Sequence, residues 1–128
     1  MSKHREVKVG VKSPEAALAE VAQTWKRAEK GRTPRKPIEG VYFADFLTMA
    51  RVLTPRRLDL LLTLQGRGKM TVRALAHFLK RDYKNVHGDV QRLKHAGLIE
   101  TDNGHVHVPW KTIRFETVLT AKPARRAA

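Results

Sequence analysis

The feature that most constrains the fold is a series of helix starts and stops in the second half of the chain. Ser, Thr and Asp are preferred at helix N-caps, and three such residues, Thr54, Thr71 and Asp82, each precede a run of apolar residues at helical spacing. Glycine is the commonest helix stop, and Gly66 and Gly97 follow two of these runs. The sequence therefore predicts three consecutive helices, over about 55–65, 72–79 and 83–96.

A β-hairpin is predicted directly after the third helix. The turn signal Asp102-Asn103-Gly104 separates a short strand, Leu98–Thr101, from a return strand, His105–Trp110. A further alternating stretch, Ile113–Thr120, suggests one more strand. Helices joined by a tight turn and followed by a hairpin describe a winged helix-turn-helix. The predicted fold class is thus mainly α with a small antiparallel β-wing, an α+β arrangement.

The first 40 residues look like an appendage to this domain. A strand is predicted over Arg5–Val11, and Ser13-Pro14 then opens a helix that ends near Gly31. Gly31–Gly40 reads as a basic linker rich in proline and glycine. One helix face carries an apolar stripe of Leu18, Val21, Ala22 and Trp25. That stripe either packs on its own domain or forms a partner or dimer face.

Three segments follow from this organisation. Residues 1–40 form a strand, a helix and a linker that contact a partner or a second copy. Residues 41–120 form the winged helix-turn-helix domain, which opens with a short extended piece at Val41–Phe43 and a helix from Phe46 to Leu53. Residues 121–128 form a disordered basic tail.

Charge is the strongest global property of the chain. Its 26 Lys and Arg outnumber 12 Asp and Glu, which gives a net charge of +14. Such an excess favours a polyanionic partner, with nucleic acid first. No apolar run approaches the roughly 18 residues of a membrane span, and the start lacks an apolar signal segment. Together with the absence of cysteine, this predicts a cytoplasmic protein without a membrane partner, associated with the nucleoid through DNA.

No catalytic set, cofactor motif or metal site is predicted. The stretch "GRGK" at 66–69 lacks the spacing of a phosphate-binding loop. Acidic residues are too scattered for a metal-dependent nuclease. His105 and His107 share a strand face, but no Cys or carboxylate cluster stands nearby to complete a metal site. The chain is therefore expected not to be an enzyme and to need no cofactor.

From Val41 to about Thr120 the chain resembles the winged helix-turn-helix transcriptional regulators of the MarR and ArsR type. It is most similar to a small prokaryotic family of predicted DNA-binding regulators, some of which look like antitoxins. The motifs are "LTPRRLDLLLTL", "TVRALAHFLKRDYKNVHGDVQRLKHAGLIE" and the following hairpin. The resemblance implies that "RALA" lies on the helix before the turn and that "KNVHGDVQRL" is the recognition helix. Gly88 departs from the pattern, since relatives often carry a basic residue there.

The predicted recognition helix has one narrow apolar seam, Val86, Val90 and Leu93. Its first two turns should supply the contacts to bases in the major groove. The candidate base-reading residues are Tyr83, Lys84, Asn85, His87 and Gly88. The candidate contacts to the DNA backbone are Arg67, Lys69, Thr71, Arg73, Lys80, Arg81, Gln91, Arg92 and Lys94. The wing contributes Asn103 and His105. Gly88 either allows close approach of the helix backbone to DNA or merely lowers stability.

These observations predict a sequence-specific regulator of double-stranded DNA, a homodimeric repressor or autorepressor. Two alternatives stay open. In the first, the protein is an antitoxin whose N-terminal segment binds a toxin while the wing domain represses their operon. In the second, it is an architectural protein that binds DNA with little sequence preference.

Overall fold

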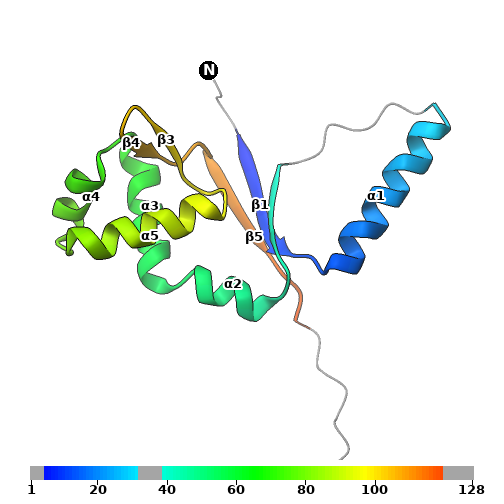
Figure 1. Cartoon of the computed structure of the whole chain (residues 1–128), viewed down its shortest axis with the longest axis horizontal. Coiled ribbons are helices and arrows are strands. Elements are labelled where there is room, and N and C mark those ends of the chain that lie inside the picture. Colours follow the sequence, from blue (N-terminus) through cyan, green and yellow to red (C-terminus); the bar gives the residue numbers. More distant parts are fainter. Residues whose placement is uncertain (1–4, 32–38, 120–128) are drawn as a thin grey trace, which may run out of the picture.

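The computed structural model describes residues 5–31 and 39–119 of the chain, which form five helices and two small sheets (Figure 1). The helices are α1 (Pro14–Glu29), α2 (Phe46–Val52), α3 (Pro55–Arg67), α4 (Val72–Leu79) and α5 (Tyr83–His95). The strands are β1 (Glu6–Val11), β2 (Gly40–Phe43), β3 (Glu100–Asp102), β4 (His105–His107) and β5 (Thr112–Glu116). Most of the predicted linker, the end of the predicted strand at Thr120 and the predicted tail lie outside the described residues.

Three strands from distant parts of the chain form a parallel sheet in the order β2-β1-β5. In the central strand, Val9 lies opposite Val41 of β2 and Phe115 of β5. Arg114 and Glu6 are 108 residues apart in sequence, yet their side chains form an ion pair of 2.9 Å across this sheet. The sequence predicts strands or extended pieces at all three places but not their pairing, because local patterns do not reveal contacts between the two ends of a chain.

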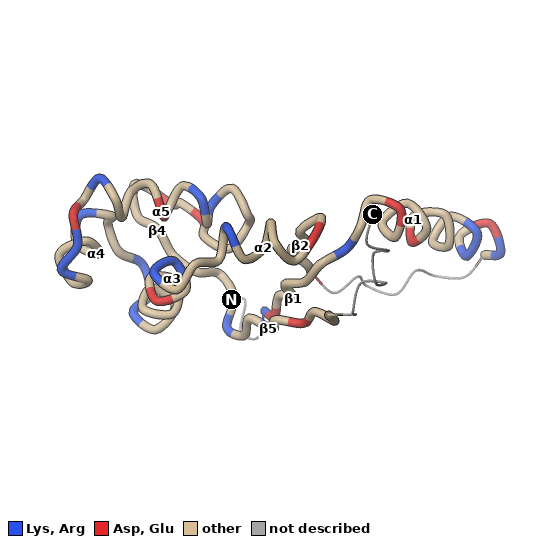
Figure 2. Tube along the Cα trace, turned by 90° about the horizontal axis from the view of Figure 1, so that it is seen from below, with Lys and Arg blue, Asp and Glu red and all other residues tan. Residues whose placement is uncertain are grey.

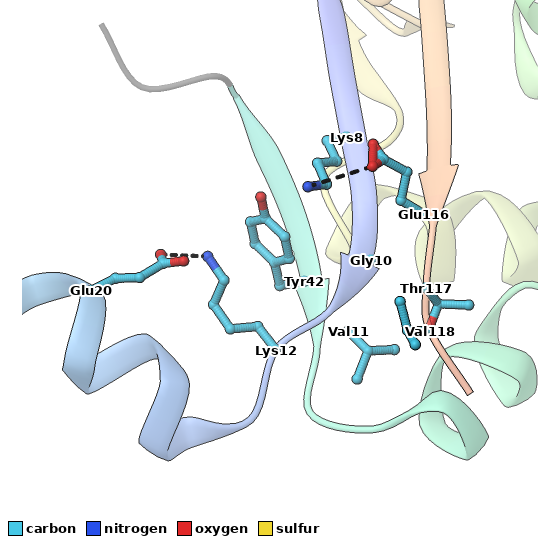
Figure 3. A pocket seen from close by; sticks show the side chains of 9 residues that line it. All are labelled: Lys8, Gly10, Val11, Lys12, Glu20, Tyr42, Glu116, Thr117 and Val118. Atoms are coloured by element: carbon cyan, nitrogen blue, oxygen red, sulfur yellow. Dashed lines mark hydrogen bonds and ion pairs between the residues drawn. The ribbon is translucent and has the colours of Figure 1, made fainter. Parts of the chain in front are cut away.

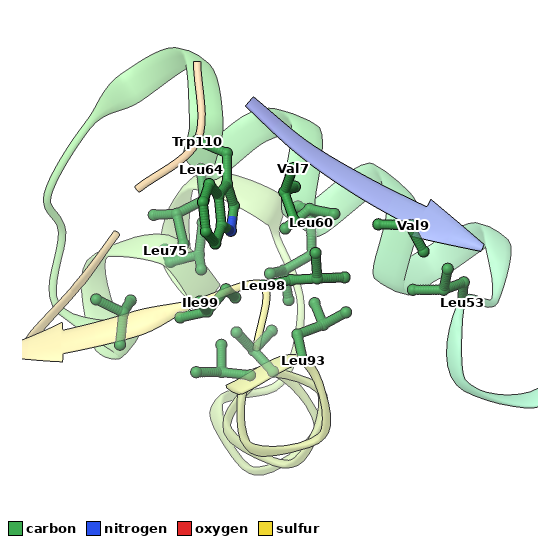
Figure 4. Close-up of a cluster of buried hydrophobic side chains, with 14 of the residues drawn as sticks. Val7, Val9, Leu53, Leu60, Leu64, Leu75, Leu93, Leu98, Ile99 and Trp110 are labelled. Carbon is green, nitrogen blue, oxygen red and sulfur yellow. The ribbon is translucent and has the colours of Figure 1, made fainter. Parts of the chain in front are cut away.

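The sheet covers the helices with one face only. Val7 and Val9 of β1 are fully buried in the apolar core, whereas the alternating residues Glu6 and Lys8 are partly exposed. The helix side forms a single apolar core between sheet, helices and hairpin (Figure 4). Its largest fully buried side chains are Leu60, Leu61, Leu64, Leu75, Leu93, Leu98, Ile99, Val7, Val9, Val86 and Val90. Parallel sheets are usually covered on both faces, so the bare outer face is unusual.

A helix begins directly after each of the predicted N-cap residues. The side chains of Ser13, Thr54, Thr71 and Asp82 each accept a hydrogen bond from a backbone N–H in the first turn. The predicted stop at Gly66 is wrong. Helix α3 runs through Gly66 to Arg67 and ends at Gly68, whose φ of 81° lies in the region that favours glycine.

The predicted hairpin is present as the antiparallel pair β3–β4. Asn103 and Gly104 take φ values of 51° and 77°, which is the geometry of a tight two-residue hairpin turn. Val106 of this hairpin is buried and exchanges backbone hydrogen bonds of 3.0 and 2.7 Å with Met70. The hairpin is therefore fixed to the loop between α3 and α4.

Helix α1 connects β1 to β2 but extends away from the sheet, opposite the helical part of the molecule (Figure 1). None of its residues is buried. Within the described residues, no helix is both long and apolar enough to cross a membrane.

Candidate functional site

Helix α5 has two chemically different sides. Val86, Val90 and Leu93 are fully buried, as the predicted apolar seam requires. The opposite side is open, and every residue predicted there is exposed: Tyr83, Lys84, Asn85, His87, Gly88, Gln91, Arg92, Lys94 and His95. The structure thus brings all five predicted base-reading residues and three of the predicted backbone-contacting residues together on one helix surface.

The single acidic residue of α5, Asp89, is turned away from this surface. Its carboxylate accepts hydrogen bonds of 3.0 Å from Arg57 Nε and 2.6 Å from Arg81 Nη2. Arg57 also donates to the backbone oxygens of Arg51 and Val52. Partial burial raises the pKa of Asp89, but the hydrogen bonds and charges of the two guanidinium groups outweigh it, so the pKa lies below its ordinary value. This cluster, Arg57–Asp89–Arg81, ties α5 to α3 and to the turn after α4.

Aromatic and basic side chains surround the start of α5. The rings of Tyr83 and His87 stack with centroids 5.9 Å apart. The Arg73 guanidinium of α4 lies 5.5 Å from the Tyr83 ring centroid, within the range of a cation–π contact. Tyr83 is therefore held between a basic side chain and a second ring, while 47% of its surface stays exposed.

Gly88 lies in the middle of the exposed surface. A Cβ built at this position meets no atom of the protein within 4 Å. Packing among the described residues therefore does not require glycine at this position.

The predicted phosphate contacts from α3, α4 and their loops divide into two groups. Two of them form ion pairs within the protein: Arg81 pairs with Asp89, and Lys69 pairs with Asp102 of β3 at 2.5 Å. The others are exposed: Arg67, Thr71, Arg73 and Lys80. Within this second group, Arg67 stacks over the Phe78 ring at 4.0 Å, and the Thr71 hydroxyl caps α4. Lys and Arg positions gather around α3, α4 and α5 at one end of the molecule (Figure 2).

The wing residues lie at the tip of the hairpin. Asn103 and His105 are exposed, and the His105 Nδ1 lies 3.1 Å from the Asn103 backbone oxygen. His107 Nε2 lies 3.7 Å from a Glu100 carboxylate oxygen, and its Nδ1 is buried without a hydrogen-bond partner among the described residues. In the part of the chain that the structure describes, no three His, Asp or Glu side chains gather into a possible metal site.

Comparison with family models matches the segment that contains this site. A model described as HVO_A0114 matches residues 52–115, which is half of the 128-residue chain. The chain belongs to the HVO_A0114 family. The match runs from the end of α2 to β5, so the family segment includes the exposed surface of α5, the Arg57–Asp89–Arg81 cluster and the hairpin. No curated protein and no solved structure matches the chain.

The apolar stripe of α1 lies outside the HVO_A0114 segment. Leu18, Val21 and Trp25 are 70%, 65% and 68% exposed, and Ala22 is exposed too. The indole N–H of Trp25 donates to Glu29 of the same helix, at 2.8 Å. The stripe therefore lies largely exposed among the described residues, and its role as a partner or dimer face stays a prediction.

The Arg57–Asp89–Arg81 cluster is a feature that the sequence pattern did not predict. Asp89 precedes the buried Val90 on an otherwise basic helix, and this single acid among bases is the signal that could have indicated an inward-facing partner. The sequence predicts a DNA contact for Arg81, because charge alone does not show where a side chain points.

Proposed function

We propose that this protein is a sequence-specific regulator of transcription that binds double-stranded DNA as a dimeric repressor or autorepressor. In this proposal, α4, the following turn and α5 form a helix-turn-helix, β3–β4 is the wing, and α5 enters the major groove. The exposed side of α5 would read bases with Tyr83, Lys84, Asn85 and His87. Arg92, Lys94 and the exposed basic residues of α3 and α4 would contact phosphates.

One observation carries the proposal: the exposed surface of α5 has donors, aromatic rings and cations but no carboxylate. The only acid of the helix is held between two guanidinium groups on the protein side. A helix in the major groove needs donors directed at base edges and phosphates, and an exposed carboxylate there would be repelled by the DNA backbone. The overall charge of +14 supports the same partner.

The first test is selection of bound duplexes from a random DNA pool, with full-length protein at about 150 mM salt. We expect one motif, in the form of an inverted repeat, because two copies of a short helix would read two half-sites. Recovery of no motif, with binding that fades steeply as salt rises, would contradict sequence-specific regulation and favour an architectural DNA-binding protein.

Variants of α5 then test which residues read the sequence. Lys84→Ala and Asn85→Ala should each reduce discrimination between the selected site and random DNA by about 1–3 kcal/mol. Arg92→Ala and Lys94→Ala should weaken binding to both DNAs and lower the salt dependence. Lys69 is a poorer choice, because its ammonium pairs with Asp102. Equal losses on both DNAs for all four variants would contradict base reading by this helix.

A second candidate function, that of an antitoxin with a protein partner, is favoured by the exposed stripe of α1. A 16-residue helix without a single buried residue gains little from its apolar side chains in the isolated chain. Co-expression with the product of the adjacent reading frame tests this function. A complex that is lost in the Leu18→Glu, Trp25→Glu variant would support it, and the absence of any complex would count against it.

A further inference from the structure

We propose that β5 is a dimerisation strand, which pairs antiparallel with β5 of a second copy and joins two three-stranded sheets into one sheet of six strands. This inference rests on the dimer of the proposed function and names the surface that forms it, but the pairing itself does not require that α5 binds DNA.

The outer edge of β5 is open. β5 lies at the end of the sheet order β2-β1-β5, and among the described residues no strand pairs with its other side. Gln65 of α3 donates to the backbone oxygens of Trp110 and Lys111, both at 3.1 Å, but these residues precede the strand. An open edge exposes unpaired N–H and C=O groups that can accept another strand.

The direction of the backbone groups identifies which residues face this edge. In β1 the N–H of Lys8 donates to Glu39 on the β2 side, at 3.0 Å, so the backbone groups of Val7 and Val9 point to β5. At the start of β5 the N–H groups of Lys111 and Thr112 both donate to the Arg5 oxygen, and further along the carbonyl oxygen of Glu116 lies 2.7 Å from a Cβ built at Gly10 of β1. Successive backbone groups of a strand alternate in direction, so those of Ile113, Phe115 and Thr117 point away from β1. An antiparallel partner would form its hydrogen bonds with these three residues.

The side chains of β5 select one register for a second copy. Arg114 and Glu116 both lie on the outer face of the sheet and are 55% and 50% exposed. If Phe115 lies opposite Phe115 of the second copy, Arg114 lies opposite Glu116 of the second copy, and the reverse pair forms across the symmetry axis. A register centred on Arg114 or on Glu116 would instead place like charges opposite each other. The register with opposite charges is also the one in which Phe115 uses its outward backbone groups.

The new ion pairs would extend a row of charges already present on the outer face. Glu116 lies 3.8 Å from Lys8 of β1, and Arg114 pairs with Glu6 of the same strand. Figure 3 shows the Lys8–Glu116 pair on this face. Each charge of β5 would then lie between two opposite charges, one from its own copy and one from the second.

The helix side of β5 offers a matching apolar surface. Phe115 is 46% exposed and Phe46 is 37% exposed. Both line an apolar hollow of about 220 Å³, together with Met49, Ala50, Leu53 and Leu58. Pairing of the two β5 strands would bring the Phe115 rings together beside two such hollows.

The pairing leaves both α5 helices accessible. In Figure 2, α5 lies on the upper side of the molecule and β5 on the lower side.

The first measurement is the mass of the full chain in solution without DNA, by sedimentation equilibrium. We expect twice the chain mass of 14.6 kDa. Phe115→Lys should give the monomer, whereas Phe78→Lys, at a similarly exposed phenylalanine of α4, should leave the dimer intact. A monomeric wild type would overturn the proposal. So would a dimer that dissociates in the Leu18→Glu, Trp25→Glu variant of α1 and not in Phe115→Lys.

A cysteine experiment tests the register with Phe115 in place. The chain has no cysteine, so the double variant Arg114→Cys, Glu116→Cys can form disulfides only through the introduced residues. In the proposed register, each sulfur lies opposite the other position of the second copy, at a distance that a disulfide can span. The double variant should form a covalent dimer on mild oxidation, and each single variant should not. Equal cross-linking by the single variants, or none by the double variant, would overturn the register.

Discussion

At the scale of single residues, Asp89 links three elements of the structure: α5, α3 and the turn after α4. Its side chain is only 15% exposed and holds Arg57 and Arg81 together. Asp89→Asn should lower the free energy of unfolding at neutral pH by about 2 kcal/mol, because two hydrogen bonds to a charged acceptor are weakened. Urea unfolding measures the change. Asp59→Asn, at an exposed carboxylate of α3, is the control and should stay within about 0.5 kcal/mol.

The charge of Asp89 should also make the stability of the fold depend on pH. The pKa of Asp89 is lower in the folded protein than its ordinary value of 3.8. Its contribution to stability is therefore complete above that value and is lost as the pH falls through the folded-state pKa. The stability difference between wild type and Asp89→Asn should be constant near neutrality and should narrow below about pH 4. A difference that persists unchanged in acid would mean that the Asp89 charge does not stabilise the fold.

At Gly88 we expect a substitution to raise the stability of the fold. Since an added Cβ meets no atom within 4 Å, Gly88→Ala should raise the free energy of unfolding by about 1 kcal/mol through the helix propensity of alanine. Thermal and urea unfolding check this gain. No gain would indicate that the backbone of α5 is constrained in some other way. A loss of DNA affinity in this more stable variant would indicate that the helix backbone approaches DNA closely at Gly88.

At the scale of elements, the contact between β1 and β5 depends on Gly10. A Cβ at this position would lie 2.7 Å from the Glu116 carbonyl oxygen, so Gly10→Ala must move β5 away from β1. We expect a loss of about 1–3 kcal/mol in unfolding free energy. Gly66→Ala in α3 is the matched control. A Cβ at this position meets no atom within 4 Å, so alanine should stabilise the helix. Equal effects of the two substitutions would contradict the tight β1–β5 contact.

Elements with local signals were predictable from the sequence, and long-range pairing was not. Helix α4 lies at its predicted bounds, because Thr71 and the apolar spacing after it are local features. The hairpin turn at Asn103-Gly104 follows from the positive φ values that these residues tolerate. By contrast, Val7 and Ile113 pair across the sheet although nothing in either strand indicates the other. The inward direction of Arg81 was equally hidden, since it depends on Asp89 from the next helix.

At the scale of the whole molecule, the first 40 residues divide into two parts with different roles. β1 is the central strand of the sheet, and its Val7 and Val9 are fully buried. Helix α1, which follows directly, has no buried residue. A truncation of residues 1–40 would therefore remove part of the core together with the exposed stripe, and a lost interaction could not be assigned to the stripe. Substitutions within α1 separate the two parts.

The triple variant Leu18→Gln, Val21→Gln, Trp25→Gln should unfold within about 2 °C of the wild type, because side chains that are about two-thirds exposed add little to the core. Deletion of residues 1–12 should instead abolish cooperative unfolding, since it removes the strand to which both β2 and β5 are bound. Differential scanning calorimetry of both proteins compares these outcomes. A large loss of stability in the triple variant would show that α1 packs on its own chain. An unchanged melting temperature would show that the fold does not need the apolar stripe of α1, which is then available for contacts with another molecule. The sheet and the other helices would still hold α5 in place.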